Sequence, residues 1–140
     1  MSEILKKENI LTNCKPAPKE EIIKKLGQIL YEDGCIEKEY IQGMIDKEGV
    51  FNTNIGNSIA IPHGIESSKV YVKKAGIAIM TIPEGTDWGS DEPVRIVIAI
   101  AGDGDVHIDI LGRIAEVLSD PDDVEKVVNS NADEIYALFA

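Results

Sequence analysis

The sequence predicts an α/β fold in a single domain: a layered, mostly parallel mixed β-sheet with helices on both faces. Two observations carry this prediction. Residues 75–82 and 94–101 are almost continuously apolar, which is typical of strands that are covered on both sides. Segments before and after these strands have apolar residues at spacings of three and four, such as Ile22, Leu26 and Ile29, and this pattern predicts amphipathic helices.

The N-terminal half is expected to form two helices between two short strands. Pro18 stands where the first turn of a helix tolerates proline, and Gly34 and Gly49 are suited to end helices. In chain order we expect a strand at residues 9–11, a helix from Lys19 to Asp33, a helix over residues 37–48, a polar loop at residues 51–54, a strand over residues 58–62 and a helical turn at residues 66–69.

The C-terminal half is expected to contain the two buried strands and then helices. Residues 83–93 form a loop between the strands, and Trp88 in this loop is predicted to pack inward as a cover over the core. Asp103 or Asp105 is expected to cap a helix that starts near Val106. The inner face of this helix is predicted to contain Ile108, Leu111, Ile114, Ala115 and Leu118, and further helices are expected from Pro121 and over residues 133–139.

Composition excludes several classes of protein. The chain has 140 residues, 44% hydrophobic and 28% charged, which suits one globular domain. A net charge of −11 argues against nucleic-acid binding, because phosphates would be repelled, and it fits an encounter with a basic partner surface. No apolar run reaches the roughly 20 residues that span a bilayer. Because the N-terminus also lacks a signal-peptide pattern, we expect a cytoplasmic protein that does not insert into the membrane.

Cysteine and histidine spacing indicates no metal centre. Cys14 and Cys35 are isolated, and His63 and His107 lie far apart in the sequence without an obvious cluster of acidic ligands. We therefore predict no structural metal ion and no cofactor.

The most informative residue is His63, which lies between Pro62 and Gly64 at the end of a predicted strand. Pro62 lacks a donor N–H and should end the ladder, whereas Gly64 allows an immediate turn. Histidine titrates near neutrality, and a ring nitrogen can act as a nucleophile. The alternative is a partly buried histidine that is satisfied by backbone hydrogen bonds. His107 follows the strand over residues 94–101, so both histidines are expected on one rim of the sheet, where ligands bind in such folds.

The segment Ile-Gly-Asn-Ser-Ile-Ala-Ile-Pro-His-Gly at residues 55–64 resembles the signature of the mannitol/fructose-type (type 2) IIA component of the bacterial sugar phosphotransferase system. The resemblance is closest to the mannitol-specific branch and covers nearly the whole chain, so residues 1–140 are expected to form one EIIA type-2 domain. It extends over residues 39–48, 82–85, 94–101 and 106–111.

This resemblance implies a phosphotransferase with a phosphohistidine intermediate. His63 would accept a phosphoryl group from phospho-HPr through Nε2 and pass it to a IIB component of a sugar permease, without metal or nucleotide. His107, expected in the first turn of its helix, would stabilise the phosphoryl group through a hydrogen bond. Lys47 stands where mannitol-type members usually have arginine; as a point charge it would contact phosphate less specifically, or it would only favour the helix dipole. Asn57 stands where related sequences often have an acid, and we assign it no function.

Two other functions are compatible with these residues. One is a regulatory IIA of the nitrogen-related branch, which keeps the histidine but acts by phosphorylation-dependent binding of partners. The other is a binding module without the chemistry, and the presence of both histidines argues against it. An adjacent gene for a membrane IIC/IIB component would favour transport. A IIA component contacts phosphoproteins rather than sugar, so the sequence leaves mannitol, fructose and other polyols open, together with the oligomeric state.

Overall fold

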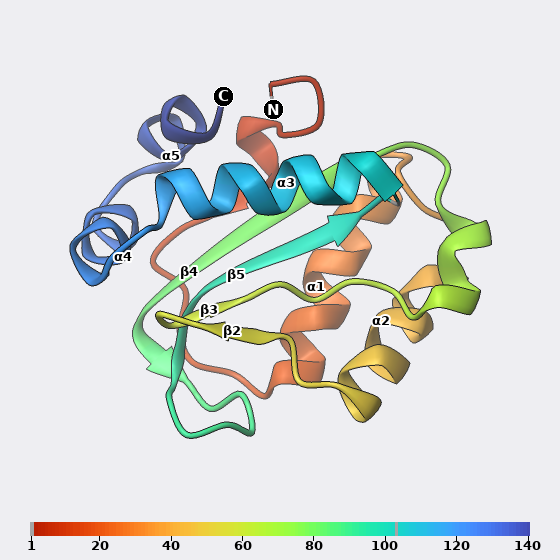
Figure 1. Cartoon of the computed structure of the whole chain (residues 1–140), viewed down its shortest axis with the longest axis horizontal. Helices are drawn as coiled ribbons and strands as arrows, with labels where there is room; N and C mark the ends of the chain where they lie inside the picture. Colours follow the sequence, from red (N-terminus) through yellow and green to blue (C-terminus); the bar gives the residue numbers. More distant parts are fainter. Residues whose placement is uncertain (1, 103) are drawn as a thin grey trace.

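The protein is built on a five-stranded mixed sheet (Figure 1). The structure, a computed structural model, describes residues 2–102 and 104–140. The strands lie in the order β1-β4-β5-β3-β2. They span Ile10–Leu11 (β1), Asn54–Gly56 (β2), Ile59–Ala60 (β3), Gly76–Thr86 (β4) and Val94–Ala101 (β5).

The directions of the strands decide which of them have their carboxyl ends at the same edge of the sheet. β1 is parallel to β4 and β3 is parallel to β5, whereas the pairs β4–β5 and β2–β3 are antiparallel. The expected mixed sheet is confirmed, but it is evenly divided rather than mostly parallel. Burial on both faces suggested parallel strands, yet helices cover both faces of this sheet while β4 and β5 form a long hairpin. The carboxyl ends of β3 and β5 lie at the same edge.

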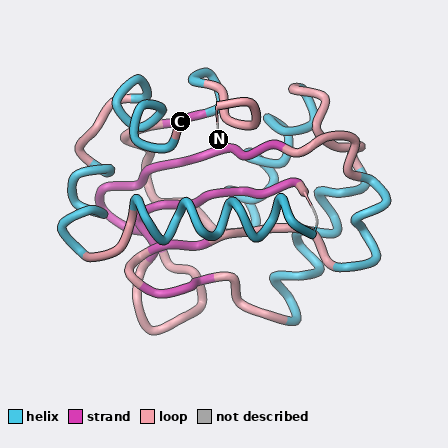
Figure 2. Tube along the Cα trace, turned by 45° about the horizontal axis from the view of Figure 1, so that its top comes forward, coloured by secondary structure: helices cyan, strands magenta, loops and turns pink. Residues whose placement is uncertain are grey.

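Helices cover the two faces in separate groups. α1 and α2 pack on one face, and α3, α4 and α5 pack on the other (Figure 1). In the turned view of Figure 2, α3 runs along the strands. The helices span Lys19–Glu32 (α1), Glu39–Val50 (α2), Gly104–Val117 (α3), Pro121–Val128 (α4) and Ala132–Phe139 (α5), with 3-10 helices at Lys7–Asn9 (η1) and Glu66–Tyr71 (η2).

Local sequence explains several of the helix boundaries. Gly34 has a φ of +79° directly after α1, as expected for a left-handed terminator. Asp120 and Asn131 begin α4 and α5 with complete capping boxes, and Pro121 is the first residue of α4. α2 continues through Gly49 to Val50, so the predicted end at Gly49 is wrong.

Two connections differ from the prediction because turn geometry competes with sequence pattern. The polar segment expected as a loop ends in strand β2, which forms a hairpin with β3. Asn57 and Ser58 form the turn with φ of +53° and +64°, so Ser58 is not part of the strand. β4 continues past Pro83 to Thr86, where Thr86 pairs with Val94 across an irregular register. Trp88 is fully buried, which confirms that it covers the core.

The buried face of α3 also differs from the prediction. The buried residues of this face are Ile110 and Ile114, followed by Leu118, whereas Ile108 is 66% exposed. Asp105 lies inside the first turn and therefore is not the N-cap. The alternative cap, Asp103, lies outside the described residues.

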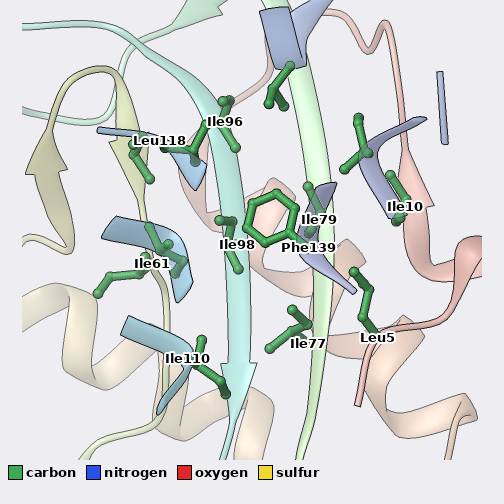
Figure 3. Close-up of a cluster of buried hydrophobic side chains, with 14 of the residues drawn as sticks. Leu5, Ile10, Ile61, Ile77, Ile79, Ile96, Ile98, Ile110, Leu118 and Phe139 are labelled. Atoms are coloured by element: carbon green, nitrogen blue, oxygen red, sulfur yellow. The ribbon is translucent and has the colours of Figure 1, made fainter. Parts of the chain in front are cut away.

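Two apolar clusters share the central strands. Along β4 and β5, alternate residues point to opposite faces: the isoleucines Ile77, Ile79 and Ile98 face α3–α5, and small residues such as Ala78 and Ala99 face α1 and α2. Figure 3 shows Phe139 of α5 over these strands, beside Ile79 and Ile98. The rim that carries the histidines is thus an edge of a rigid, doubly covered sheet.

Within residues 2–102 and 104–140, no helix is long and apolar enough to cross a membrane.

Candidate functional site

His63 stands at the carboxyl end of β3, on a backbone that is held by β5. It forms a parallel bridge with Ile100, and the Ile100 N–H donates to the Pro62 carbonyl at 2.9 Å. The Gly64 N–H donates instead to the hydroxyl of Tyr40. β3 itself ends at Ala60, short of the predicted end at Pro62, and a single bridge at His63 is the last pairing of this segment with β5. The position of His63 where pairing ends is thus as predicted, although the strand is shorter.

One nitrogen of the His63 ring is fixed by its own backbone. Nδ1 lies 2.7 Å from the Ile61 carbonyl oxygen. A carbonyl oxygen can only accept, so Nδ1 has the proton and the neutral ring keeps its lone pair on Nε2. No group within residues 2–102 and 104–140 makes a hydrogen bond to Nε2. Burial lowers the pKa of His63, partly offset by the Ile61 carbonyl, so the nucleophilic neutral form dominates at neutral pH.

His107 completes a pair of histidines at this edge. It closes the first turn of α3 and lies one turn before Ile110 and Leu111, on the side of the helix that faces the sheet. The centroids of the His63 and His107 rings are 5.0 Å apart, and the ring planes meet at 64°. Burial first, and then the neighbouring His63 and Lys69, lowers the pKa of His107. The structure thus brings the two predicted histidines together.

Two lysines supply positive charge near these rings. Lys47, in the last turn of α2, is half-buried and lies 5.3 Å from the centre of the Phe51 ring. Lys69 of η2 is also half-buried and pairs with Glu66 at 3.0 Å. Beyond the dominant effect of burial, both charges lower the pKa of His63, and only Lys69 also lowers that of His107.

Lys69 was missed by the sequence analysis. Its only sequence signal is its position six residues after His63, in a segment that was recognised as a helical turn. The sequence analysis also assigned no role to Tyr40, although its hydroxyl bonds to the backbone beside His63. Both contacts depend on how α2 and η2 meet the end of β3, which residue spacing does not specify.

Asn57 lies away from the histidines and has a structural role. It forms the β2–β3 turn, and its side-chain amide donates to the Leu118 carbonyl at 3.3 Å, after the end of α3. Within the described part of the chain, no three His, Cys, Asp or Glu side chains gather so that they could hold a metal ion.

The arrangement defines a class of protein. A neutral imidazole with an open Nε2, a second imidazole 5.0 Å away and two nearby lysines suit the transfer of an anionic group through a histidine. The model of the family described as "Phosphoenolpyruvate-dependent sugar phosphotransferase system, EIIA 2" matches residues 3–140. The chain belongs to this family, and it is a phosphocarrier component of that system.

Individual relatives are similar over nearly their full lengths. The chain is 43% identical over 131 residues to a mannitol-specific phosphotransferase enzyme IIA component from Geobacillus stearothermophilus, covering 94% of this chain and 90% of the relative. It is 35% identical to the enzyme IIAMTL of Escherichia coli, solved in complex with phosphorylated enzyme IIBMTL, with a TM-score of 0.89 and coverage of 97% and 98%. The nitrogen regulatory protein IIA-Ntr from Neisseria meningitidis has a similar fold, with a TM-score of 0.79 at 22% identity over 99% and 98% of the chains.

Proposed function

We propose that this protein is the IIA phosphocarrier of a mannitol-type phosphotransferase system, which accepts a phosphoryl group from phospho-HPr on Nε2 of His63 and passes it to a IIB component. The observation that carries this proposal is the His63 ring, with Nδ1 fixed at 2.7 Å from the Ile61 carbonyl and Nε2 open. The similarity to relatives that are named mannitol-specific supports the sugar branch.

The proposed chemistry is two in-line displacements at phosphorus. In the first, the lone pair of Nε2 attacks phosphorus, the bond from phosphorus to the donor histidine breaks, and its electron pair returns to the donor nitrogen. In the second, a nucleophile on IIB attacks and the bond to Nε2 breaks. The Nδ1 proton stays on His63 throughout, held by the Ile61 carbonyl. Because the donor is already a phosphohistidine, the transfer consumes no nucleotide.

The charge that develops on the phosphoryl oxygens needs donors. His107 is proposed to stabilise it by a hydrogen bond, because its ring is 5.0 Å from that of His63 at the start of α3, where the helix dipole favours anions. Lys47 is proposed as a phosphate contact, and its charge already acts on His63. Lys69, whose charge acts on both rings, is the second available cation.

Residues 1–140 are proposed to act as one EIIA type-2 domain in the cytoplasm, where phosphocarrier partners of this kind are found. The regulatory nitrogen-type alternative has less support, since the similarity to the nitrogen regulatory protein extends only to the fold at 22% identity. Transfer onward to a mannitol IIB distinguishes the two functions.

The test is a reconstituted relay. The protein is incubated with Enzyme I, HPr and labelled phosphoenolpyruvate, and a mannitol IIB domain is then added. Acid-labile, base-stable label should appear on the protein, move to IIB, and be absent in His63→Ala. Label that persists on His107 in His63→Ala, or label that never reaches IIB, would contradict the proposal.

A further inference from the structure

Tyr40 is a buried tyrosine whose hydroxyl makes two hydrogen bonds to the backbone around His63. It lies in the first turns of α2 and is 1% exposed. The hydroxyl donates to the Ile100 carbonyl at 2.9 Å and accepts from the Gly64 N–H at 2.8 Å. Burial raises the pKa of Tyr40 to about 12, so the hydroxyl keeps its proton and its donor role at neutral pH.

This hydroxyl is inserted where the ladder between the strands would otherwise continue. His63 bridges Ile100 in parallel, and the Ile100 N–H donates to the Pro62 carbonyl. In a regular parallel ladder the next hydrogen bond would join the Gly64 N–H directly to the Ile100 carbonyl. The Tyr40 oxygen stands between these two groups, so it separates the chain from β5 at the residue after His63.

The ring of Tyr40 also packs against the same glycine. A Cβ on Gly64 would lie 2.8 Å from Cζ of Tyr40 and closer still to Cε1 and to Oγ of Ser68. The next N–H, of Ile65, donates to the Gly43 carbonyl of α2 at 3.0 Å. Backbone hydrogen bonds thus fix Pro62 on one side of His63, and Tyr40 fixes Gly64 on the other.

We propose that Tyr40 is a positioning residue for phosphoryl transfer: its hydroxyl sets the peptide that follows His63 and thereby aims Nε2 at the site beside His107. The proposal rests on the proposed function in one respect, the role of His63 as acceptor. Tyr40 does not touch the partner proteins, because it is buried, and it acts only through the backbone.

Loss of the hydroxyl has a defined consequence. The Gly64 N–H and the Ile100 carbonyl would lose their partners, and such buried groups are costly to leave unpaired. They can recover one hydrogen bond by joining each other directly, which draws Gly64 toward β5. That movement turns the His63 peptide and changes the 5.0 Å spacing of the two histidine rings.

The test compares Tyr40→Phe with Tyr136→Phe, a matched control in α5 whose hydroxyl makes no hydrogen bond within the described residues. Rapid-quench transfer from phospho-HPr is measured over a range of donor concentrations, and the His63 ring is followed by NMR through a pH titration. Because misplacement by about 1 Å can cost about 100-fold, Tyr40→Phe should lower the saturating rate about 10- to 100-fold. The half-saturating donor concentration should not change, the His63 ring resonances should shift, and Tyr136→Phe should change none of these.

A folded Tyr40→Phe protein with the wild-type saturating rate overturns the proposal, and so does a rate that falls only with the unfolded fraction. His63→Ala, measured beside it, separates the two claims. If His63→Ala loses label while Tyr40→Phe keeps its rate, only the positioning role is wrong. If His63→Ala keeps label, both claims are wrong.

Should Tyr40→Phe not fold, 3-fluorotyrosine at position 40 replaces it, because the fluorine weakens the hydroxyl oxygen as a hydrogen-bond acceptor. A shifted Gly64 amide resonance with an unchanged rate then overturns the proposal.

Discussion

At the scale of single residues, the two histidines are held in different ways. His63 is fixed by its own backbone through the Ile61 carbonyl, which leaves one defined nitrogen open. His107 is placed by the periodicity of α3, and its ring makes no hydrogen bond within the described part of the chain. One imidazole is therefore prepared as a nucleophile, and the other is free to donate to an anion that arrives beside it.

Replacing His107 tests this division. Loss of a well-placed donor to a transferred group costs about 100–1,000-fold in rate. His107→Ala should fold, accept phosphate slowly from phospho-HPr and pass it slowly to IIB, whereas His107→Gln should recover part of the rate. Rapid-quench time courses in both directions measure this, with Asp109→Ala, an exposed change in the same helix, as the control. Wild-type rates for a folded His107→Ala protein would mean that His107 does not stabilise the phosphoryl group and only occupies the start of the helix.

The two lysines should be separable by titration. A positive charge opposes protonation of a neighbouring imidazole, so removing it raises the pKa. Lys69→Ala should therefore raise the pKa of both His63 and His107, whereas Lys47→Ala should raise only that of His63. NMR titration of the ring protons measures both, with Lys24→Ala on α1 as control.

The lowered pKa values also predict a pH dependence. In the wild type both titration midpoints should lie below 6.5, so phosphoryl acceptance should persist below pH 6.5 and decline only as the pH falls through the midpoint of His63. Midpoints above 6.5 would contradict this electrostatic account.

At the scale of elements, the site depends on close contact between the end of β3, α2 and η2. Gly64 lies against both Tyr40 and Ser68, and Ser68 in turn donates to the Ile65 carbonyl at 2.6 Å. The Ile61 N–H donates to the Thr53 carbonyl, and Thr53 is held by the buried carboxylate of Glu48. Tyr40 and Ser68 leave no space for a larger residue directly after His63.

Gly64→Ala should consequently destabilise the protein by about 1–3 kcal/mol, the usual cost of overpacking, and impair transfer. Gly112→Ala is the matched control: this glycine is exposed in α3, with nothing within 4 Å of an added Cβ. It should stabilise the protein by about 0.5–1 kcal/mol through helix propensity and leave transfer unchanged. Chemical denaturation measures both. Equal stability of the two variants would mean that the region after His63 is loosely packed.

Much of this arrangement could be predicted from the sequence, because strand burial, helix periodicity and the Pro62–His63–Gly64 pattern are local. Placement of both histidines at carboxyl ends of strands followed from the order of the elements. The exposed Ile108 was misjudged because positions 108, 111, 115 and 118 form as regular a helical stripe as 110, 114 and 118, and only packing against the sheet decides which stripe is buried. The roles of Tyr40 and Lys69 depend on how distant elements meet, so no local pattern reveals them.

At the scale of the whole molecule, the two apolar clusters are built on the same two strands, β4 and β5. Neighbouring residues of β4 and β5 alternate between the clusters, so neither face can lose its packing without exposing strands that the other face needs. The rim at the end of β5 is thus supported from both sides, which suits a site that must hold two rings in a fixed relation. We expect the domain to unfold in one step.

Trp88 reports on this coupling, because it is the single tryptophan, is fully buried and belongs to the cluster on the α1–α2 face. Its fluorescence and the far-UV circular dichroism should follow the same denaturation curve. A fluorescence transition that precedes the loss of helix would show that the two faces unfold separately.

The most direct test of the account is to locate the phosphoryl group on a ring nitrogen. Protein with ¹⁵N-labelled histidine is phosphorylated by phospho-HPr and observed by long-range ¹H–¹⁵N NMR with coupling to phosphorus. The structure predicts phosphorus coupled to Nε2 of His63, while Nδ1 stays protonated and hydrogen-bonded to the Ile61 carbonyl. Phosphorus on Nδ1 of His63, or on either nitrogen of His107, would contradict the assignment of the nucleophile.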